Sequence, residues 1–491
     1  MKKKLASAAL FSLVSKGLNI VSMLLLTPVI LDVIGKEQYG LWILILSIIA
    51  WFNVFELGFP AAIYRFATLF LEQKKYDQLN RYLATFLVVF GGLGLIAVLV
   101  LVLFGFFPHW FDVGDDNAGL FSFTIFLFTI KVIVDFLSHI PNSIFVANLR
   151  IDIDEKVTAF SLLIKLIAIY LLIDDFGILT LIGVTLVTEI GANLLKVVLA
   201  YRLLPSLKLD LRFFSMDVFR EIFSFSKHVF ILGIARVLND RIDPFIIVKF
   251  LDLKSVAIFN IANNLITQLN LLIISFFKFQ GAIFTKKIAA KQSAENLYNT
   301  ICTANTYVGL VFASCVVILA DPFVHLWLGE EFEASVGLLY VLAFGVVIRP
   351  ITATSNQLLL AMATHKLLAV VQFVCALVNI GLSIVLIGDY GLVGVAFSTV
   401  FSNLLSNVIL VNVLLPRYTD YKLTALRMRM IYSVANLGVV TYFFAGTNVM
   451  AFVDSWLMLF VAAAGVFAVV SVLNLTIFVG QFGALRSIIK R

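Results

Sequence analysis

Charged side chains lie inside the long apolar segments of this sequence, where an ionised group is costly. On insertion scales each one costs about 2.5–3.5 kcal/mol at the centre of a bilayer, and several together would exceed a protein's usual stability of about 5–15 kcal/mol. We therefore expect most of them to pair with one another or to line a polar cavity. Those nearest the middle of their segments are Glu56, Lys131, Asp135, Lys165, Glu189, Arg236, Asp240 and Arg349.

Spacing predicts two ion pairs within single helices. Lys131 and Asp135 are four residues apart, and the same spacing separates Arg236 from Asp240. Residues four apart are neighbours on one face of a helix. These pairs can either neutralise each other within the bundle or contribute to a site.

Cations outnumber acids among the intramembrane charges, which favours an anionic ligand. Lys165 and Arg349 have no acidic partner at helical spacing in their own segments. Other cations lie nearer the cytoplasmic ends, where they would attract an anionic headgroup, although long basic side chains also snorkel to the interface without any such role. The candidates for binding an anionic substrate are Lys16, Arg65, Lys131, Lys165, Lys227, Arg236, Lys278 and Arg349.

Intramembrane carboxylates are candidates for coupling transport to protons or sodium ions, a role that such groups have in transporters. Pro244 directly follows Asp243 and removes one helix hydrogen bond. It therefore predicts a kink in the helix that could act as a hinge. The coupling candidates are Glu56, Asp135, Glu189, Asp240 and Asp243.

Amide side chains recur beside these charges at helical spacing in both halves of the chain. Small polar residues also mediate helix packing in membranes, so serine stripes alone would indicate little. Asn and Gln close to Lys are more typical of the wall of a hydrophilic cavity. The expected cavity-lining residues are Asn19, Asn264, Gln268, Gln372 and Asn379.

Motifs of common enzyme classes are absent from the sequence. There is no Walker loop, HExxH or GxSxG motif, the histidines are scattered without metal-ligand spacing, and the cysteines form no CxxC pair. We therefore expect no metal, no cofactor and no enzymatic activity. Transport would draw on an ion gradient, the membrane potential or the substrate gradient.

Composition identifies the environment of these residues. Hydrophobic residues make up 62% of the 491 residues and charged residues 13%, with a mean hydropathy of +1.05. Soluble domains have roughly 45–50% apolar and 25% charged residues, so the chain is expected to be an integral membrane protein. The net charge of +7 comes from basic residues spread between apolar runs, which argues against a nucleic-acid partner.

Apolar runs predict an all-α protein with about fourteen transmembrane helices. Lys and Arg concentrate in alternate connections, which predicts that both termini are cytoplasmic. The expected spans are 8–33, 39–70, 83–107, 120–147, 157–173, 178–201, 222–250, 255–285, 301–327, 335–363, 367–388, 391–415, 429–447 and 456–480.

Short motifs suggest a repeat and a family. The segment from Ile34 to Trp42 resembles that from Leu251 to Phe259, as in transporters built from two parallel repeats. Tyr39-Gly40-Leu41-Trp42, Glu56-Leu57-Gly58-Phe59 and Arg241-Ile242-Asp243-Pro244 resemble the polysaccharide transporter family. That family includes O-antigen flippases and belongs to the multidrug/oligosaccharidyl-lipid/polysaccharide exporter superfamily.

The resemblance implies two six-helix lobes around a central cavity plus two C-terminal helices. The corresponding divisions are residues 1–205, 206–416 and 417–491. It also implies a flippase in the bacterial cytoplasmic (inner) membrane that moves undecaprenyl-diphosphate-linked oligosaccharide from the cytoplasmic to the outer leaflet by alternating access. The expected partners are this polyprenyl-diphosphate-linked glycan, membrane lipid and a polysaccharide polymerase.

Two other functions remain open at this point. A cation-coupled multidrug antiporter of the same superfamily would have about twelve spans and a cavity dominated by carboxylates, which hold cations. A membrane polysaccharide polymerase or ligase would carry a large catalytic outer loop, whereas the predicted outer loops are short.

Overall fold

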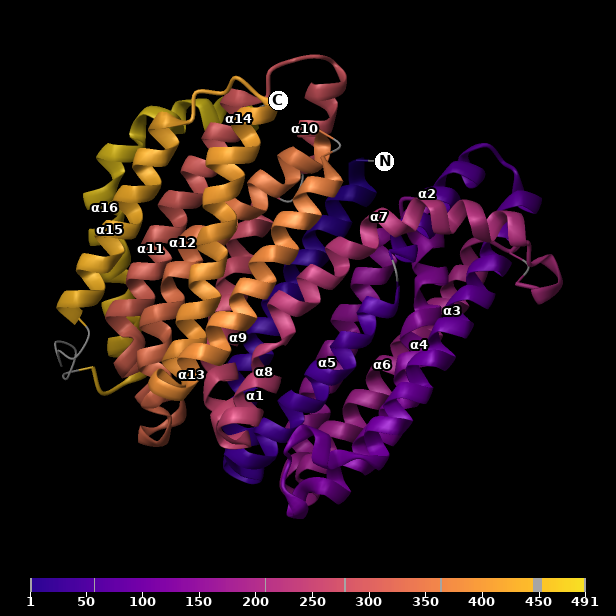
Figure 1. The fold of residues 1–491 in the computed structure, drawn as a ribbon, viewed down its shortest axis with the longest axis horizontal. Coiled ribbons are helices and arrows are strands. Elements are labelled where there is room, and N and C mark those ends of the chain that lie inside the picture. Colours follow the sequence, from indigo (N-terminus) through magenta and orange to yellow (C-terminus); the bar gives the residue numbers. More distant parts are fainter. Residues whose placement is uncertain are drawn as a thin grey trace. The chain divides into compact units, whose positions relative to one another are not determined.

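The computed structural model describes the backbone of residues 2–56, 58–207, 209–277, 280–362, 364–444 and 453–489. Within these ranges all regular elements are helical (Figure 1), and ten helices are long and apolar enough to cross a membrane. Two of the ten, Val14–Glu56 and Lys366–Tyr418, each contain a break at a glycine with positive φ, Gly35 (70°) or Gly391 (55°). The expectation of an all-α membrane protein is confirmed; the number of spans stays a prediction.

Contacts between helices divide the chain into two compact units, residues 1–257 and 258–491. The elements that begin in the first unit are α1 (Lys2–Trp51), η1 (Phe52–Glu56), α2 (Phe59–Glu72), α3 (Tyr76–Phe106), η2 (Pro108–Phe111), α4 (Asp115–Ala147), α5 (Ile151–Phe176), α6 (Ile178–Leu203), η3 (Leu211–Phe213), α7 (Met216–Arg241), α8 (Asp243–Phe250) and α9 (Leu253–Ser275). In this unit α4 packs against α2, α3 and α6, while α5 packs against α1 and α6. The lobe division at residue 205 stays a prediction.

The second unit contains the remaining elements. These are α10 (Gln280–Ala289), α11 (Glu295–Leu328), η4 (Glu330–Phe332), α12 (Ala334–Ala361), α13 (His365–Ile409), the π-helical turn η5 (Leu410–Leu414), α14 (Leu415–Tyr418), α15 (Thr424–Phe444) and α16 (Trp456–Ile489). Here α11 is central, because it packs against α12, α15 and α16, which lie beside it in Figure 1.

The expected span 39–70 is not one helix. α1 ends at Trp51, η1 follows, and α2 begins at Phe59. Gly58 has a φ of 74°, a left-handed conformation that favours glycine, and Pro60 occupies the first turn of α2, where its missing N–H costs nothing. The break places Glu56 at the end of a short 3-10 helix instead of inside a continuous span.

Two further expected spans are also interrupted. In 222–250, α7 ends at Arg241 and α8 begins at Asp243 with Pro244 in its first turn, so the predicted kink lies where the proline indicated. In 255–285, α9 ends at Ser275 and α10 begins at Gln280. The join between α5 and α6, by contrast, separates two helices as expected.

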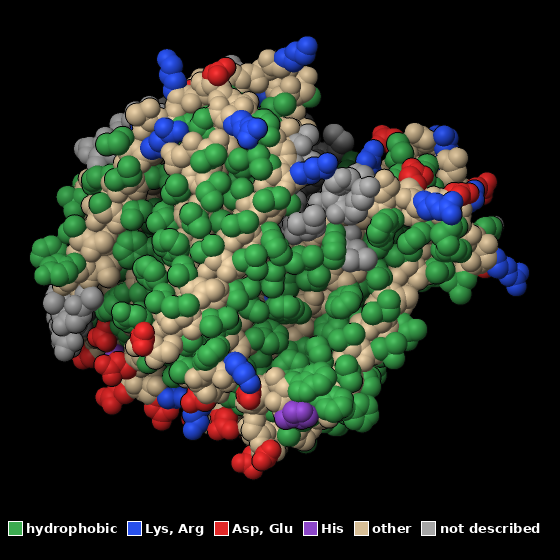
Figure 2. Space-filling view, in the orientation of Figure 1, with side chains coloured by type: hydrophobic (Ala, Val, Ile, Leu, Met, Phe, Trp, Pro, Cys, Tyr) green, Lys and Arg blue, Asp and Glu red, His purple; other side chains and the backbone are tan. Residues whose placement is uncertain are grey.

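The exposed flanks of the helices are apolar. Figure 2 shows hydrophobic side chains over most of the visible helix surfaces, with charged side chains gathered mainly toward helix ends. Large apolar residues such as Tyr442, Leu457 and Val187 are more than two-thirds exposed. Large exposed apolar surfaces of this kind suit contact with lipid and not with water.

The two repeat-like segments contact each other within the first unit. Gly40 of α1 lies so close to the start of α9 that a Cβ atom on it would be 1.8 Å from the carbonyl oxygen of Leu253. Three polar contacts surround this approach. They are Glu37 Oε2 to Lys254 Nζ (3.9 Å), Asn117 Nδ2 to Glu37 Oε1 (2.9 Å) and Lys249 Nζ to Asp112 Oδ2 (2.8 Å).

Candidate functional site: a charged cluster on α4, α5 and α6

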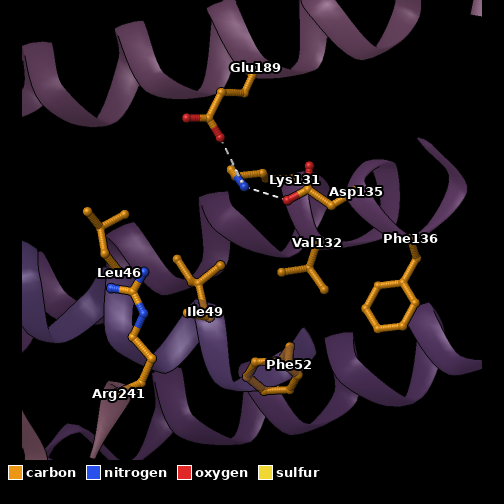
Figure 3. Close-up of a pocket in the computed structure, with 10 residues that line it drawn as sticks. Leu46, Ile49, Phe52, Lys131, Val132, Asp135, Phe136, Glu189 and Arg241 are labelled. Atoms are coloured by element: carbon orange, nitrogen blue, oxygen red, sulfur yellow. Dashed lines mark hydrogen bonds and ion pairs between the residues drawn. The ribbon is translucent and has the colours of Figure 1, made fainter. Parts of the chain in front are cut away.

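Four of the charges singled out in the sequence meet in the first unit. Lys131 binds Asp135 one turn further along α4, as the spacing predicted, and its Nζ also lies 3.0 Å from Glu189 Oε2 on α6 (Figure 3). Lys165 of α5 places its Nζ 3.0 Å from Glu189 Oε1. Glu189 therefore bridges two lysines that come from two different helices.

Pairing explains how the membrane helices tolerate these charges. Two ammonium groups face two carboxylates, so the cluster is formally neutral, and Asn193 Nδ2 donates to the second oxygen of Asp135 at 3.1 Å. Burying ions is costly unless they are paired and hydrogen-bonded. The interpretation of Lys165 as a cation without an acidic partner holds only for its own helix, because its partner comes from α6.

The cluster forms one wall of a cavity of about 250 Å³. Lys131, Asp135 and Glu189 line it together with apolar residues of α1, and Arg241 reaches it from the end of α7. In Figure 3 the Arg241 side chain lies near Leu46, apart from the Lys131–Asp135 pair. The cavity therefore presents one cation that is separate from the paired charges of its wall.

The position of Arg241 depends on the helix break next to it. Trp51 Nε1 at the end of α1 donates to the Arg241 backbone oxygen at 3.2 Å, and the Trp51 ring packs against Phe245 with centroids 5.3 Å apart. These contacts connect the two breaks, one after α1 and one after α7, at the rim of the cavity. Arg241 was not among the predicted site residues.

A second polar group lies one turn further along α4. His139 Nε2 is 3.0 Å from Glu56 Oε1, and its Nδ1 is 3.3 Å from the Tyr64 hydroxyl. The side chains of Glu56 and His139 are about one-fifth exposed. In the sequence the five histidines appear scattered. The missed signal is spacing, because residues 131, 135 and 139 share one helical face.

His139 is expected to stabilise the break between α1 and α2. Replacing it with Ala leaves Glu56 without this partner, and an unsatisfied buried polar group costs about 1–3 kcal/mol. We expect a lower midpoint of thermal unfolding in detergent for His139→Ala, with partial recovery for His139→Gln, whose amide can still donate. The exposed His109 provides the control, and equal midpoints for His139→Ala and His109→Ala would contradict this role.

Other predicted residues of the first unit lie apart from the cluster. Lys16 is half-buried on α1, and Asn19 is exposed and donates to the Ser15 carbonyl of its own helix at 3.0 Å. Arg65 is exposed on α2. Asp240 is exposed near the end of α7, whereas Asp243 is buried in the first turn of α8.

The remaining described candidates belong to the second unit. Gln372 of α13 donates to Ser406 Oγ at 3.0 Å, and Asn379 is fully buried on the same helix. Gln268 Nε2 lies 3.5 Å from Asn264 Oδ1 on α9, and Arg349 is half-buried on α12.

Three predicted cations cannot be placed in a site. Lys278 lies outside the described residues. Lys227 and Arg236 lie on α7, but their side chains are outside the described part of the structure, so the expected pair between Arg236 and Asp240 stays a prediction.

The sequence of this chain is similar to those of known proteins. A family model described as "Polysaccharide biosynthesis protein" matches residues 29–337. The "Uncharacterized membrane protein EpsK" of Bacillus subtilis (strain 168) is 24% identical over 409 residues, which cover 81% of this chain and 80% of that protein.

Solved structures share the fold. The lipid II flippase MurJ in an inward closed conformation has a TM-score of 0.73 at 17% identity, covering 95% of this chain and 99% of that one. An inward-facing multidrug resistance MATE family transporter of the MOP superfamily has a TM-score of 0.62 at 12% identity, covering 89% and 96%. A MOP superfamily transporter from Pyrococcus furiosus, described as having a binding pocket of reverse polarity, has a TM-score of 0.58 at 12% identity, covering 89% of this chain and 96% of that one.

Proposed function

Because the chain belongs to the polysaccharide biosynthesis protein family of the MOP superfamily, we propose that it flips a polyprenyl-diphosphate-linked oligosaccharide across the membrane. The cargo in this proposal is an undecaprenyl-diphosphate-linked repeat unit, such as that of an O-antigen. It moves from the cytoplasmic to the outer leaflet of the bacterial inner membrane. Family membership and the MurJ-like fold support a lipid-linked glycan as the substrate class.

The observation that carries the proposal is that two cations, Lys131 and Arg241, line one cavity from different helices. Lys165 joins the Lys131 cluster through Glu189. Ammonium groups bind phosphate as point charges, and a guanidinium binds phosphate oxygens in a bidentate fashion. A diphosphate placed between Arg241 and Lys131 would meet donors from two sides. The paired carboxylates keep the empty cavity close to neutral.

The remaining features of the proposal follow the family. The chain has about fourteen spans in this proposal, and both termini are cytoplasmic. The spans form two lobes, residues 1–205 and 206–416, plus a C-terminal pair of helices. The two lobes give alternating access to a central cavity. Asn19, Asn264, Gln268 and Gln372 face the sugars in this proposal. An ion gradient or the membrane potential drives movement of the glycan, and the intramembrane carboxylates are the coupling groups. A polysaccharide polymerase is the candidate partner that uses the translocated glycan.

The deciding experiment measures the leaflet distribution of polyprenyl-diphosphate-linked glycans. Cells depleted of the protein are expected to accumulate these glycans on the cytoplasmic leaflet, and complementation is expected to restore their outward distribution. Membrane levels of the protein are measured in parallel, so that loss of transport is distinguished from loss of protein.

Two other outcomes would contradict the proposal. A normal outward distribution with changed sensitivity to cationic drugs would indicate a multidrug antiporter. A normal distribution with unpolymerised repeat units on the outer leaflet would indicate a polymerase or ligase.

A further inference from the structure

We propose that the α4–α6 cluster exchanges partners with its substrate: a diphosphate takes Lys131 and Lys165 from Asp135 and Glu189, and the released carboxylates bind protons. This proposal rests on the proposed function, because it requires an anionic lipid-linked substrate. It adds a mechanism by which substrate binding and proton uptake are linked at one site.

Both lysines of the cluster are already paired with carboxylates. Both oxygens of Glu189 are used, one by Lys131 and one by Lys165, and Lys131 is shared with Asp135. The exposed fraction of the Lys131 side chain is only 12%, which leaves little surface for another anion while both carboxylates stay bound. A phosphate group that reaches Lys131 must therefore displace at least one carboxylate.

Among the described residues, a displaced carboxylate has no neighbouring cation except those that also attract the diphosphate. Its charged neighbours are Lys131 on its own wall, Lys165 from α5 and Arg241 from α7 across the cavity, all of which attract the diphosphate. Asn193 of α6 supplies only a neutral amide, and the α1 residues that line the cavity are apolar. His139, one turn along α4, is already engaged by Glu56.

Protonation resolves this imbalance without any covalent step. An isolated carboxylate in a low-dielectric site is costly and becomes neutral by binding a proton from the adjoining water. When the diphosphate leaves at the outer face, each lysine pairs again with its carboxylate and the proton returns to the outside water. The protons therefore travel outward with the cargo, so they neutralise its charge and do not draw on the inward proton gradient. One or two protons can be bound in this way, because two carboxylates compete for the lysines.

Proton uptake also lowers the cost of moving the cargo. A diphosphate diester carries about two negative charges at neutral pH, and burying unbalanced charge in the membrane costs several kcal/mol per ion. With the lysines facing the diphosphate and the carboxylates neutral, the loaded site retains a charge close to that of the empty site. The sign of the pH dependence follows: each proton taken up strengthens diphosphate binding as the pH falls, by up to about tenfold per pH unit.

The test uses the purified full-length protein in lipid nanodiscs and a short-chain prenyl-diphospho-N-acetylglucosamine as the probe. Its diphosphate is a diester, so the probe itself does not titrate near neutral pH. Calorimetry in two buffers of different ionisation enthalpy gives the number of protons bound per probe. We expect net uptake by the wild type and a dissociation constant that falls with decreasing pH.

The double variant Asp135→Asn/Glu189→Gln removes both proton acceptors. It is expected to bind the probe at least as tightly as the wild type, with no net proton uptake and no pH dependence. Asp154→Asn is the matched control, because Asp154 pairs with Lys196 on the same helices α5 and α6 at 2.6 Å, and it should retain the uptake.

Failure of this proposal is distinguishable from failure of the proposed function. Wild-type protein that binds and translocates the probe without proton uptake would overturn the exchange and leave the flippase intact. Unchanged uptake in a folded double variant would also overturn it. Absence of probe binding to the wild type would overturn both. The wild-type measurement decides the question even if the double variant fails to fold.

Discussion

Lys131→Gln is expected to reduce translocation of the lipid-linked glycan by at least about tenfold. Lys131 contacts both carboxylates of the cluster and lines the cavity, so its loss removes the cation on which the other charges depend. Asp135 and Glu189 would then have only Lys165 as a partner within the cluster, and a diphosphate would lose one of the two cations that line the cavity. Hydrogen bonds to charged groups contribute about 1.5–3 kcal/mol, which corresponds to roughly ten- to hundredfold in affinity.

The measurement is the initial rate of glycan appearance in the outer leaflet, normalised to the amount of protein in the membrane. Lys196→Gln is the matched control. Lys196 is buried on α6 and paired with Asp154 at 2.6 Å, but neither residue lines the cavity. Lys131→Gln breaks two ion pairs and Lys196→Gln breaks one, so both variants disrupt ion pairing in the membrane helices but only the first does so at the cavity. Equal rates for Lys131→Gln and the wild type would remove the cluster from the transport site.

Gly40→Ala is expected to separate the start of α9 from α1. The added Cβ would lie 1.8 Å from the Leu253 carbonyl oxygen and 2.7 Å from its carbonyl carbon. These are backbone atoms, so rotation of a side chain cannot relieve the clash. Overpacking of this kind costs about 1–3 kcal/mol, and the helices must shift for the variant to fold. The adjoining pairs of Lys254 with Glu37 and of Lys249 with Asp112 would lengthen.

Crosslinking at the last of these pairs measures the shift. Asp112→Cys and Lys249→Cys replace two side chains whose charged atoms lie 2.8 Å apart, so a short thiol-reactive crosslinker should join them efficiently when Gly40 is present. Adding Gly40→Ala should reduce the yield several-fold and lower the midpoint of thermal unfolding. Gly91→Ala on α3 is the control, because a Cβ atom there has no neighbour within 4 Å. Unchanged crosslinking in Gly40→Ala would show that this close approach does not hold the helices together.

Local patterns in the chain were sufficient for several features of the fold and site. Long apolar runs predicted membrane helices because about twenty consecutive apolar residues span the hydrocarbon core of a bilayer, whichever helices lie beside them. The spacing of Lys131 and Asp135 predicted their contact, since a helix alone brings residues four apart together. Pro244 predicted the break between α7 and α8 because proline disrupts the helix that contains it.

Features that depend on two or more segments required the tertiary structure. Gly58 and Pro60 interrupt a helix within a continuous apolar run. Hydropathy alone did not predict this break, because it depends on side-chain polarity and not on backbone conformation. Lys165 appeared to lack an acidic partner because that partner, Glu189, lies 24 residues away on the next helix. His139 appeared isolated because Glu56 and Tyr64 approach it from other elements.

The sequence by itself determined that this chain is an all-α membrane protein with costly charges inside its helices, and its motifs indicated a polysaccharide transporter. Each of these conclusions rests on composition or on residues close together in the chain. Which charges meet was decided only by helix packing, which brought α4, α5 and α6 together around Glu189 and placed Arg241 at the same cavity. The reason is that electrostatic pairing depends on distance in space, and neighbouring membrane helices are selected by contacts along their whole length.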